Sequence, residues 1–169
     1  FITSMKSAVK SENIELSELN FLTEDAVPAD CACLVIHSPR TDLSADDRDK
    51  VAAYLAGGGR LLLITDYTGV DMPNLAALME YYGVSRVDGI VVEGDANHSV
   101  RGYYHYLLPN INSHAITTPL RIGNYFVLMP VAQGLVVSDS LRGTLSVTEL
   151  LTTSDKAYSK LAVANLESF

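Results

Sequence analysis

Two polar pairs follow two apolar segments of the chain, and their side chains could do chemistry together. His37 and Ser38 come directly after "CACLVI", and Asp66 and Tyr67 come directly after "RLLLIT". Ligands of open parallel sheets bind beyond the carboxyl ends of the strands, so we expect these four residues to line a binding crevice. A Ser, a His and an Asp near one crevice also invite comparison with a hydrolase. Adjacent Ser and His do not readily form a nucleophile–base pair, however, and the sequence has neither a G-x-S-x-G elbow nor a Gly-x-Cys elbow. We therefore predict ligand binding without catalytic residues, and keep a hydrolase or amidotransferase-like enzyme as the less favoured alternative.

A second candidate site lies in the segment "NHSVRGYYHY", which concentrates aromatic and cationic side chains. Arg101, Tyr103, Tyr104 and His105 could bind a sugar, a peptide or a carboxylate by stacking and by charge-assisted hydrogen bonds. The same tyrosines could instead pack the loop against the sheet. His98 and His105 do not share a helical face and no third ligand accompanies them, so we predict no metal site and no cofactor.

Three consecutive glycines, Gly57 to Gly59, raise the possibility of a phosphate-binding loop. Such a loop follows a strand and opens a helix, because the free N–H groups of the helix then face the anion. Here the glycines follow a predicted helix over residues 44–56. Ser44 is a good N-cap for that helix, and Asp47 lies three residues later. We therefore interpret the glycines as a helix C-cap and a tight turn.

The elements that must position these residues alternate along the middle of the chain. The pattern predicts a strand over 31–39 with Cys31 and Cys33 buried in it, a strand over 61–65, a helix over 72–83 and a strand region over 86–95. This alternation favours a parallel sheet with helices on both faces. We further expect a helix over 1–10, a strand over 13–21, a loop with a short helical turn at 103–108, and strands within 115–137 and 145–154.

Composition limits the partners. The chain has 169 residues and a formal net charge of -8, with no basic stripe, so we predict no nucleic-acid partner. Its length suits a single domain over 1–169. No apolar run reaches the roughly 20 residues of a membrane-spanning helix. Because the chain begins with Phe1, we expect a fragment of a larger protein whose membrane anchor lies outside these residues.

Four motifs in order resemble a known family. "VPADCACLVIHSPRTDLSADDRDKVAAYLAGGGRLLLITD" and "MPNLAALMEYYGV" are similar to the core of the ABC-transporter auxiliary proteins related to gliding-motility components. "SHAITTPL" is similar to their "H-P-I-T" element, with Ala115 where Pro is usual. "VTELLTTSDKAYSK" is similar to their "V-x-x-L-L-x-T-S" ending. The resemblance covers about residues 20–165.

The resemblance implies an α/β fold, namely a three-layer flavodoxin-like or amidotransferase-like sandwich with a mostly parallel sheet and a β-rich C-terminal part. It also implies a non-catalytic auxiliary subunit of an ABC transport system, on the extracytoplasmic side of the cell membrane. The expected partners are ABC permease and ATPase subunits, or a transported small molecule, glycan or peptide. A carbohydrate- or peptide-binding module is the main alternative.

Overall fold

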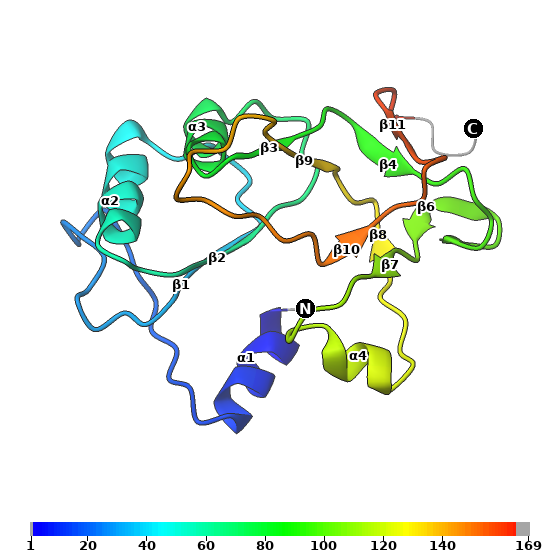
Figure 1. Ribbon diagram of the computed structural model, residues 1–169. Helices are drawn as coiled ribbons and strands as arrows, with labels where there is room; N and C mark the ends of the chain where they lie inside the picture. Colours follow the sequence, from blue (N-terminus) through cyan, green and yellow to red (C-terminus); the bar gives the residue numbers. More distant parts are fainter. Residues whose placement is uncertain (1, 165–169) are drawn as a thin grey trace.

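The computed structural model describes residues 2–164, in which short strands and four helices alternate (Figure 1). The helices are α1 (Ile2–Ser11), α2 (Ala45–Ala56), α3 (Pro73–Tyr81) and α4 (Thr118–Ile122). The strands are β1 (Leu34–His37), β2 (Leu61–Ile64), β3 (Val84–Arg86), β4 (Ile90–Val92), β5 (Ser99–Val100), β6 (Tyr103–Leu107), β7 (Asn110–Ile111), β8 (Met129–Pro130), β9 (Leu135–Val137), β10 (Leu151–Thr152) and β11 (Tyr158–Lys160). No helix within residues 2–164 has the length and apolar character to cross a bilayer.

The α2 helix forms where its local signals predict it. Ser44 is the N-cap, and its hydroxyl oxygen accepts a hydrogen bond from the N–H of Asp47 at 3.0 Å. Asp46 and Asp47 lie in the first turn, where negative charge suits the helix dipole. Val51 is fully buried on the inner face of the helix. The prediction of a helix over 44–56 is therefore confirmed to within one residue.

The glycine run after α2 terminates the helix and lets a tyrosine lie against the backbone. Gly58 has a φ of +91°, in the left-handed region that favours glycine. A Cβ on Gly59 would lie 2.4 Å from the ring of Tyr54. The Tyr54 hydroxyl donates to the carbonyl oxygen of Cys31 at 3.1 Å and accepts from the N–H of Arg60 at 3.1 Å. Tyr54 therefore joins the end of α2 to the segments that enter β1 and β2.

The first two strands form the parallel part of the fold. Leu34 pairs with Leu61 and His37 pairs with Ile64, with α2 as the connection between the strands. The apolar cluster beneath α2 contains Val27, Leu34, Val51 and Leu78, so it joins β1, α2 and α3. This strand–helix–strand unit agrees with the sequence pattern.

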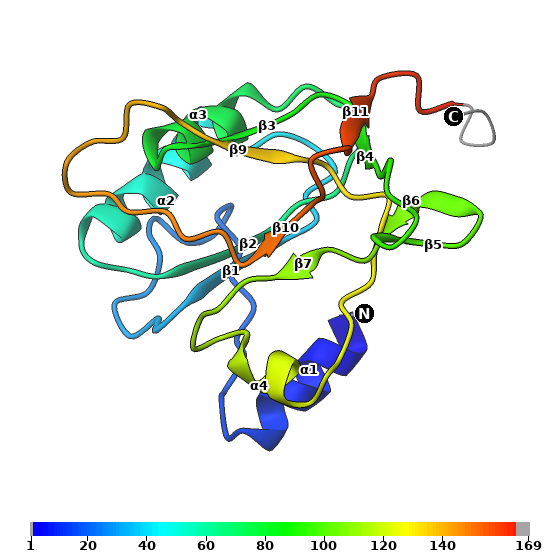
Figure 2. The ribbon, with the colours of Figure 1, turned by 45° about the vertical axis from the view of Figure 1, so that its right-hand side comes forward.

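The rest of the fold corrects the predicted fold class. The strand region after α3 does not continue a parallel sheet, because β3 pairs with β9 and β4 pairs with β11, both antiparallel. The remaining pairs, β7 with β10 and β5–β6–β8, are also antiparallel, and Figures 1 and 2 show these small sheets side by side. The prediction of a three-layer flavodoxin-like or amidotransferase-like sandwich with a mostly parallel sheet is wrong. The apolar runs of 86–95 take their partners from the C-terminal third instead of from β2.

Several local predictions also need correction. Residues 13–21 form no regular strand, and residues 103–107 form β6 in place of a helical turn. Residues 118–122 form α4 inside a segment that was expected to be strand. Cys31 is only half-buried and Cys33 is exposed, because β1 begins at Leu34 and both cysteines precede it. The predicted helix over 1–10 agrees with α1, although residue 1 lies outside the described residues.

The α3 helix receives its N-terminal cap from a distant loop. Its own N-cap residue, Met72, makes no side-chain capping bond. The Asp42 carboxylate accepts hydrogen bonds from the N–H of Asn74 at 2.9 Å and from the N–H of Leu75 at 3.0 Å. The Asn74 side-chain amide donates to the same carboxylate at 2.9 Å. Burial raises the pKa of Asp42, but these hydrogen bonds outweigh it and hold the pKa below its ordinary value.

Candidate functional site

The predicted crevice residues lie at the ends of β1 and β2: His37 is the last residue of β1, Ser38 follows it, and Asp66 and Tyr67 follow β2. The N–H of Ser38 donates to the carbonyl oxygen of Ile64 at 2.7 Å, which places Ser38 beside the end of β2. Ser38 has a φ of +46°, a strained value for a residue with a side chain. The Asp66 carboxylate lies 3.7 Å from a guanidinium nitrogen of Arg40, and both side chains are largely exposed. Asp66 is therefore engaged in a surface ion pair with Arg40.

A cleft of about 500 Å³ opens just past β2, on the side of α3 and β3. Of the four predicted crevice residues, Tyr67 lines this cleft, whereas His37, Ser38 and Asp66 are not part of its lining. Its polar lining includes Asp71, Glu80, Arg86, Asp88 and Gln133. A cleft therefore lies near the predicted position, but it is on the side of α3, and of the four predicted residues it contains Tyr67.

The aromatic segment after residue 98 is a β-hairpin. Arg101 and Gly102 form the turn between β5 and β6, and Arg101 is exposed. Tyr103 and Tyr104 are 54% and 39% exposed, so they do not pack the loop into the core. The centroids of the Tyr103 and Tyr106 rings lie 5.4 Å apart. The His105 ring lies edge-on to Tyr106, with 4.9 Å between their centroids. The hairpin therefore carries an aromatic surface on β6, while His98 lies apart from it, before β5.

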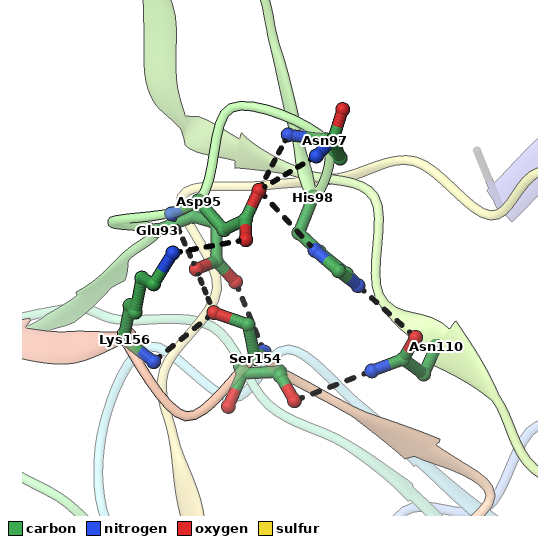
Figure 3. A network of polar contacts seen from close by, with 8 residues as sticks. Glu93, Asp95, Asn97, His98, Asn110, Ser154 and Lys156 are labelled. Atoms are coloured by element: carbon green, nitrogen blue, oxygen red, sulfur yellow. Dashed lines mark hydrogen bonds and ion pairs between the residues drawn. The ribbon is translucent and has the colours of Figure 1, made fainter.

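The end of β4 carries a buried carboxylate that organises the surrounding backbone (Figure 3). Glu93 is 2% exposed. Its carboxylate accepts hydrogen bonds from the N–H of Asp95 at 3.0 Å, from the N–H of Ser154 at 3.1 Å and from the Ser154 hydroxyl. Burial raises the pKa of Glu93, but the Ser154 hydroxyl, these two N–H groups and the nearby His98 outweigh it and hold the pKa below its ordinary value. The Ser154 hydroxyl points its proton at Glu93, so this pair joins two chain segments and presents no free nucleophile.

A second set of polar contacts lies around Glu93 and is centred on Asp95. The Asp95 carboxylate accepts from the N–H and side-chain amide of Asn97, and lies 3.4 Å from the Lys156 ammonium. The N–H of Asn97, followed by the Lys156 charge, holds the pKa of Asp95 below its ordinary value. We refer to Glu93, Asp95, Asn97, His98, Asn110, Ser154 and Lys156 as the Glu93 cluster.

The amide of Asn110 determines which nitrogen of His98 carries a proton. Asn110 Nδ2 donates to the carbonyl oxygen of Thr153 at 3.4 Å, so Asn110 Oδ1 faces His98. His98 Nε2 lies 3.1 Å from this oxygen and must be the donor. His98 Nδ1 is buried and lies 3.9 Å from Asp95, too far for a hydrogen bond. The imidazole is thus held by Asn110 through Nε2, and its Nδ1 faces the Asp95 carboxylate.

The outer face of the Glu93 cluster opens into a groove of about 370 Å³ against α4. We call it the α4 groove, and it is lined by Asn97, His98, Leu108, Pro109, Asn110, Ile111, Arg121, Asn124, Tyr125 and Phe126. The wall formed by residues 121–126 belongs to the end of α4 and to the turn after it. The opposite wall belongs to the segment that leads into β5, to the β6–β7 connection and to β7 itself.

The turn after α4 displays two aromatic rings. Gly123 ends the helix, and a Cβ at this position would lie 2.3 Å from the Tyr125 ring. Asn124 has a φ of +51°, and the N–H of Tyr125 donates back to the carbonyl oxygen of Leu120 at 2.9 Å. The Tyr125 ring therefore lies over the end of the helix. Tyr125 is 65% exposed and Phe126 is 81% exposed.

Sequence reasoning missed the residues that build this site. Glu93, Asn110, Ser154, Tyr125 and Phe126 were not singled out as candidates. The signal for Glu93 was a lone carboxylate directly after the apolar strand "IVV". The signal for α4 was Thr117 followed by Pro119 at the second helical position, a pattern common at helix starts. Among the described residues, no group of three or more His, Cys, Asp or Glu side chains could hold a metal ion.

Comparison with known proteins bears on the fold. No protein-family model matches the chain, and a search of curated proteins finds no match. Among solved structures, a chain described as "mmIFT52 N-terminal domain" is similar, with a TM-score of 0.63 and 18% sequence identity. The similarity covers 90% of this chain and 71% of that chain. At this identity the comparison shows a shared fold.

Proposed function

We propose that this chain is a non-catalytic binding domain that holds a partner subunit in the α4 groove, as an auxiliary component of an ABC transport system. The assignment to a transport system rests on the family resemblance of the four sequence motifs. Binding through the α4 groove rests on one structural observation. Two large aromatic side chains, Tyr125 and Phe126, line the α4 groove and are largely exposed to solvent.

The surroundings of the α4 groove support a protein partner. Ile116 and Ile122 are 67% and 82% exposed, and they lie in the same segment as the two rings. Neither isoleucine lines the groove, but exposed apolar side chains near a groove are typical of interaction sites. Aromatic residues are enriched at such sites because they supply a large contact area at a low cost in side-chain entropy.

The geometry of the Glu93 cluster supports a non-catalytic role. Its only serine hydroxyl donates to a buried carboxylate, and its histidine is held between Asn110 and Asp95. These contacts fix the backbone on one side of the α4 groove. A rigid wall of this kind lowers the cost of binding, because little conformational freedom is lost when the partner arrives.

The same proposal places the domain on the extracytoplasmic side of the membrane, anchored by segments outside these residues.

A carbohydrate- or peptide-binding module is the second candidate. The exposed Tyr103 and Tyr104 on β6 favour it, because exposed aromatic rings stack on sugars or on peptide side chains.

The test is affinity purification of the protein from its native membrane in mild detergent, followed by mass spectrometry. We expect permease and ATPase subunits to accompany the wild-type protein and the control variant Leu22→Ser, whose side chain is 94% exposed outside the groove. We expect Phe126→Ser to lose these subunits. Recovery of the same subunits with Phe126→Ser would contradict binding through the α4 groove. A glycan or small molecule that accompanies the protein without any subunit would favour the second candidate.

A further inference from the structure

The charge of the α4 groove differs from that of the rest of the protein. The chain carries 20 Asp and Glu residues against 12 Lys and Arg residues. The ten residues that line the groove include Arg121 and no Asp or Glu. In a protein with a formal net charge of -8, a lining whose one fully charged side chain is cationic favours an anion locally, with Asp95 behind His98 as the nearest carboxylate that the contacts of the lining show.

Arg121 is available to a ligand. Its side chain is exposed, and within residues 2–164 its guanidinium forms no ion pair and no hydrogen bond. The backbone of Arg121 is fixed as part of α4 through the hydrogen bond from its N–H to the carbonyl oxygen of Thr117 at 3.1 Å. A guanidinium on a fixed backbone can bind a carboxylate with two parallel hydrogen bonds.

Asn124 supplies a second donor on the same wall. Its side-chain amide forms no hydrogen bond with the described residues, and its backbone is held in the left-handed region by the turn after α4. By contrast, the amides of Asn97 and Asn110 on the opposite wall are already used by Asp95 and by the carbonyl oxygen of Thr153. Among the described residues, the groove side chains with free donors are therefore Arg121, Asn124 and the exposed Tyr125 hydroxyl, and Arg121 is the one that carries a full charge.

The apolar part of the groove lining indicates that the ligand also has an apolar portion. Leu108, Pro109 and Ile111 lie on the β6–β7 side, and Tyr125 and Phe126 lie on the other side. A carboxylate at Arg121 thus lies within the same groove as an aliphatic and aromatic surface. A neutral sugar gives Arg121 no charge partner. A nucleic acid would meet a single guanidinium in a protein that repels polyphosphate.

We infer that the α4 groove binds an acidic peptide segment of the partner, in which an Asp or Glu side chain that pairs with Arg121 neighbours an apolar side chain that packs on Phe126. This inference rests on the proposed function and adds the chemistry of the partner to it. His98 is not the anion's partner, because it is engaged by Asn110 and faces Asp95.

The test is selection from a library of random peptides displayed on phage, with the full chain as bait. Fluorescence anisotropy of the selected peptides then measures their affinity. We expect enrichment of Asp and Glu beside an aromatic or aliphatic residue. Arg121→Glu should weaken binding by about 10-fold or more, because it replaces an attraction by a repulsion. About 0.5 M NaCl should also weaken binding, because the pair is partly exposed.

Two further variants separate this inference from the proposed function. Arg60→Glu makes the same charge change at an exposed arginine outside the groove, and we expect it to leave affinity within about 2-fold of wild type. Phe126→Ser should weaken every ligand of the α4 groove. Selected peptides that are neutral or basic and still depend on Phe126 would overturn the acidic partner and leave the groove function intact. Binding that is insensitive to both Phe126→Ser and Arg121→Glu would overturn both proposals, as would a selection that yields no peptide. A glycan whose binding is lost in Phe126→Ser would overturn the peptide assignment.

Discussion

The Glu93 carboxylate accepts both the N–H and the hydroxyl proton of Ser154, a residue 61 positions further along the chain. This pair joins the end of β4 to the segment between β10 and β11. Because Glu93 is buried, its charge depends on these donors, on the N–H of Asp95 and on the nearby His98 for compensation. The pair is therefore one of the polar links between the middle and the C-terminal parts of the described fold, beside the β4–β11 pairing.

We expect Glu93→Gln to destabilise the protein by about 1–3 kcal/mol, because an amide nitrogen cannot accept the hydrogen bonds that one carboxylate oxygen now accepts. Urea denaturation followed by circular dichroism measures this change. Glu15→Gln is the matched control, since Glu15 is exposed and we expect its free energy of unfolding to stay at the wild-type value. Equal stability of Glu93→Gln and wild type would show that the buried carboxylate is not needed.

Acid should destabilise the fold through the carboxylates whose pKa values are lowered, Asp42, Glu93 and Asp95. A carboxyl group with a lowered pKa in the folded state stabilises the protein above its unfolded-state pKa. That contribution is lost as the pH falls through the folded-state pKa. We expect the free energy of unfolding to decline as the pH drops below the ordinary Glu value of 4.5. Urea titrations at a series of pH values test this, and Glu93→Gln should give a shallower decline. A decline of unchanged steepness in that variant would contradict the role assigned to Glu93.

Asp42 should be required for the start of α3. Asp42→Ala removes the acceptor for the N–H groups of Asn74 and Leu75, and we expect a loss of about 1–2 kcal/mol, as for other lost helix caps. Asp42→Asn keeps one oxygen and should lose less. Thermal unfolding compares these variants with Asp30→Ala, which changes an exposed aspartate outside any cap. A melting temperature of Asp42→Ala equal to that of the control would rule out the capping role.

Gly59 should tolerate no side chain as long as Tyr54 is present. We expect Gly59→Ala to cost about 1–3 kcal/mol, because its Cβ would overlap the Tyr54 ring and displace its hydroxyl from Cys31 and Arg60. Gly143→Ala is the control, since a Cβ there meets nothing within 4 Å. Combining Gly59→Ala with Tyr54→Leu should give less than the sum of the two single effects. Additive effects would mean that the two residues do not interact.

The features that the sequence predicted are those whose causes are local. Ser44, the acidic first turn and Gly57 to Gly59 all act within one helix, so α2 could be assigned from the sequence alone. The parallel pairing of β1 with β2 could also be inferred, because a strand–helix–strand unit has few other solutions. His37 and Ser38 were correctly expected at the end of a strand.

The features that could not be predicted depend on partners far away in the chain. An apolar run such as 90–92 fits a parallel or an antiparallel neighbour equally well, and only its pairing with β11 decides the sheet. Glu93 shows the same limit. Its carboxylate is recognisable as a buried acceptor only when Ser154 is placed beside it. The α4 groove depends on two segments that meet only in the folded chain, so its lining could not be read from either one.

The late partners of β3, β4 and β7 have a consequence for the order of assembly. These strands pair with β9, β11 and β10, and all three partners lie in the last quarter of the described chain. During synthesis the α2 unit can form early from local contacts, whereas β3, β7 and β4 must wait for residues 137, 152 and 160, respectively, to leave the ribosome. A nascent chain halted before Ser154 would hold Glu93 with the N–H of Asp95 as a donor but without the two donors of Ser154, so the polar end of β4 is completed late in synthesis.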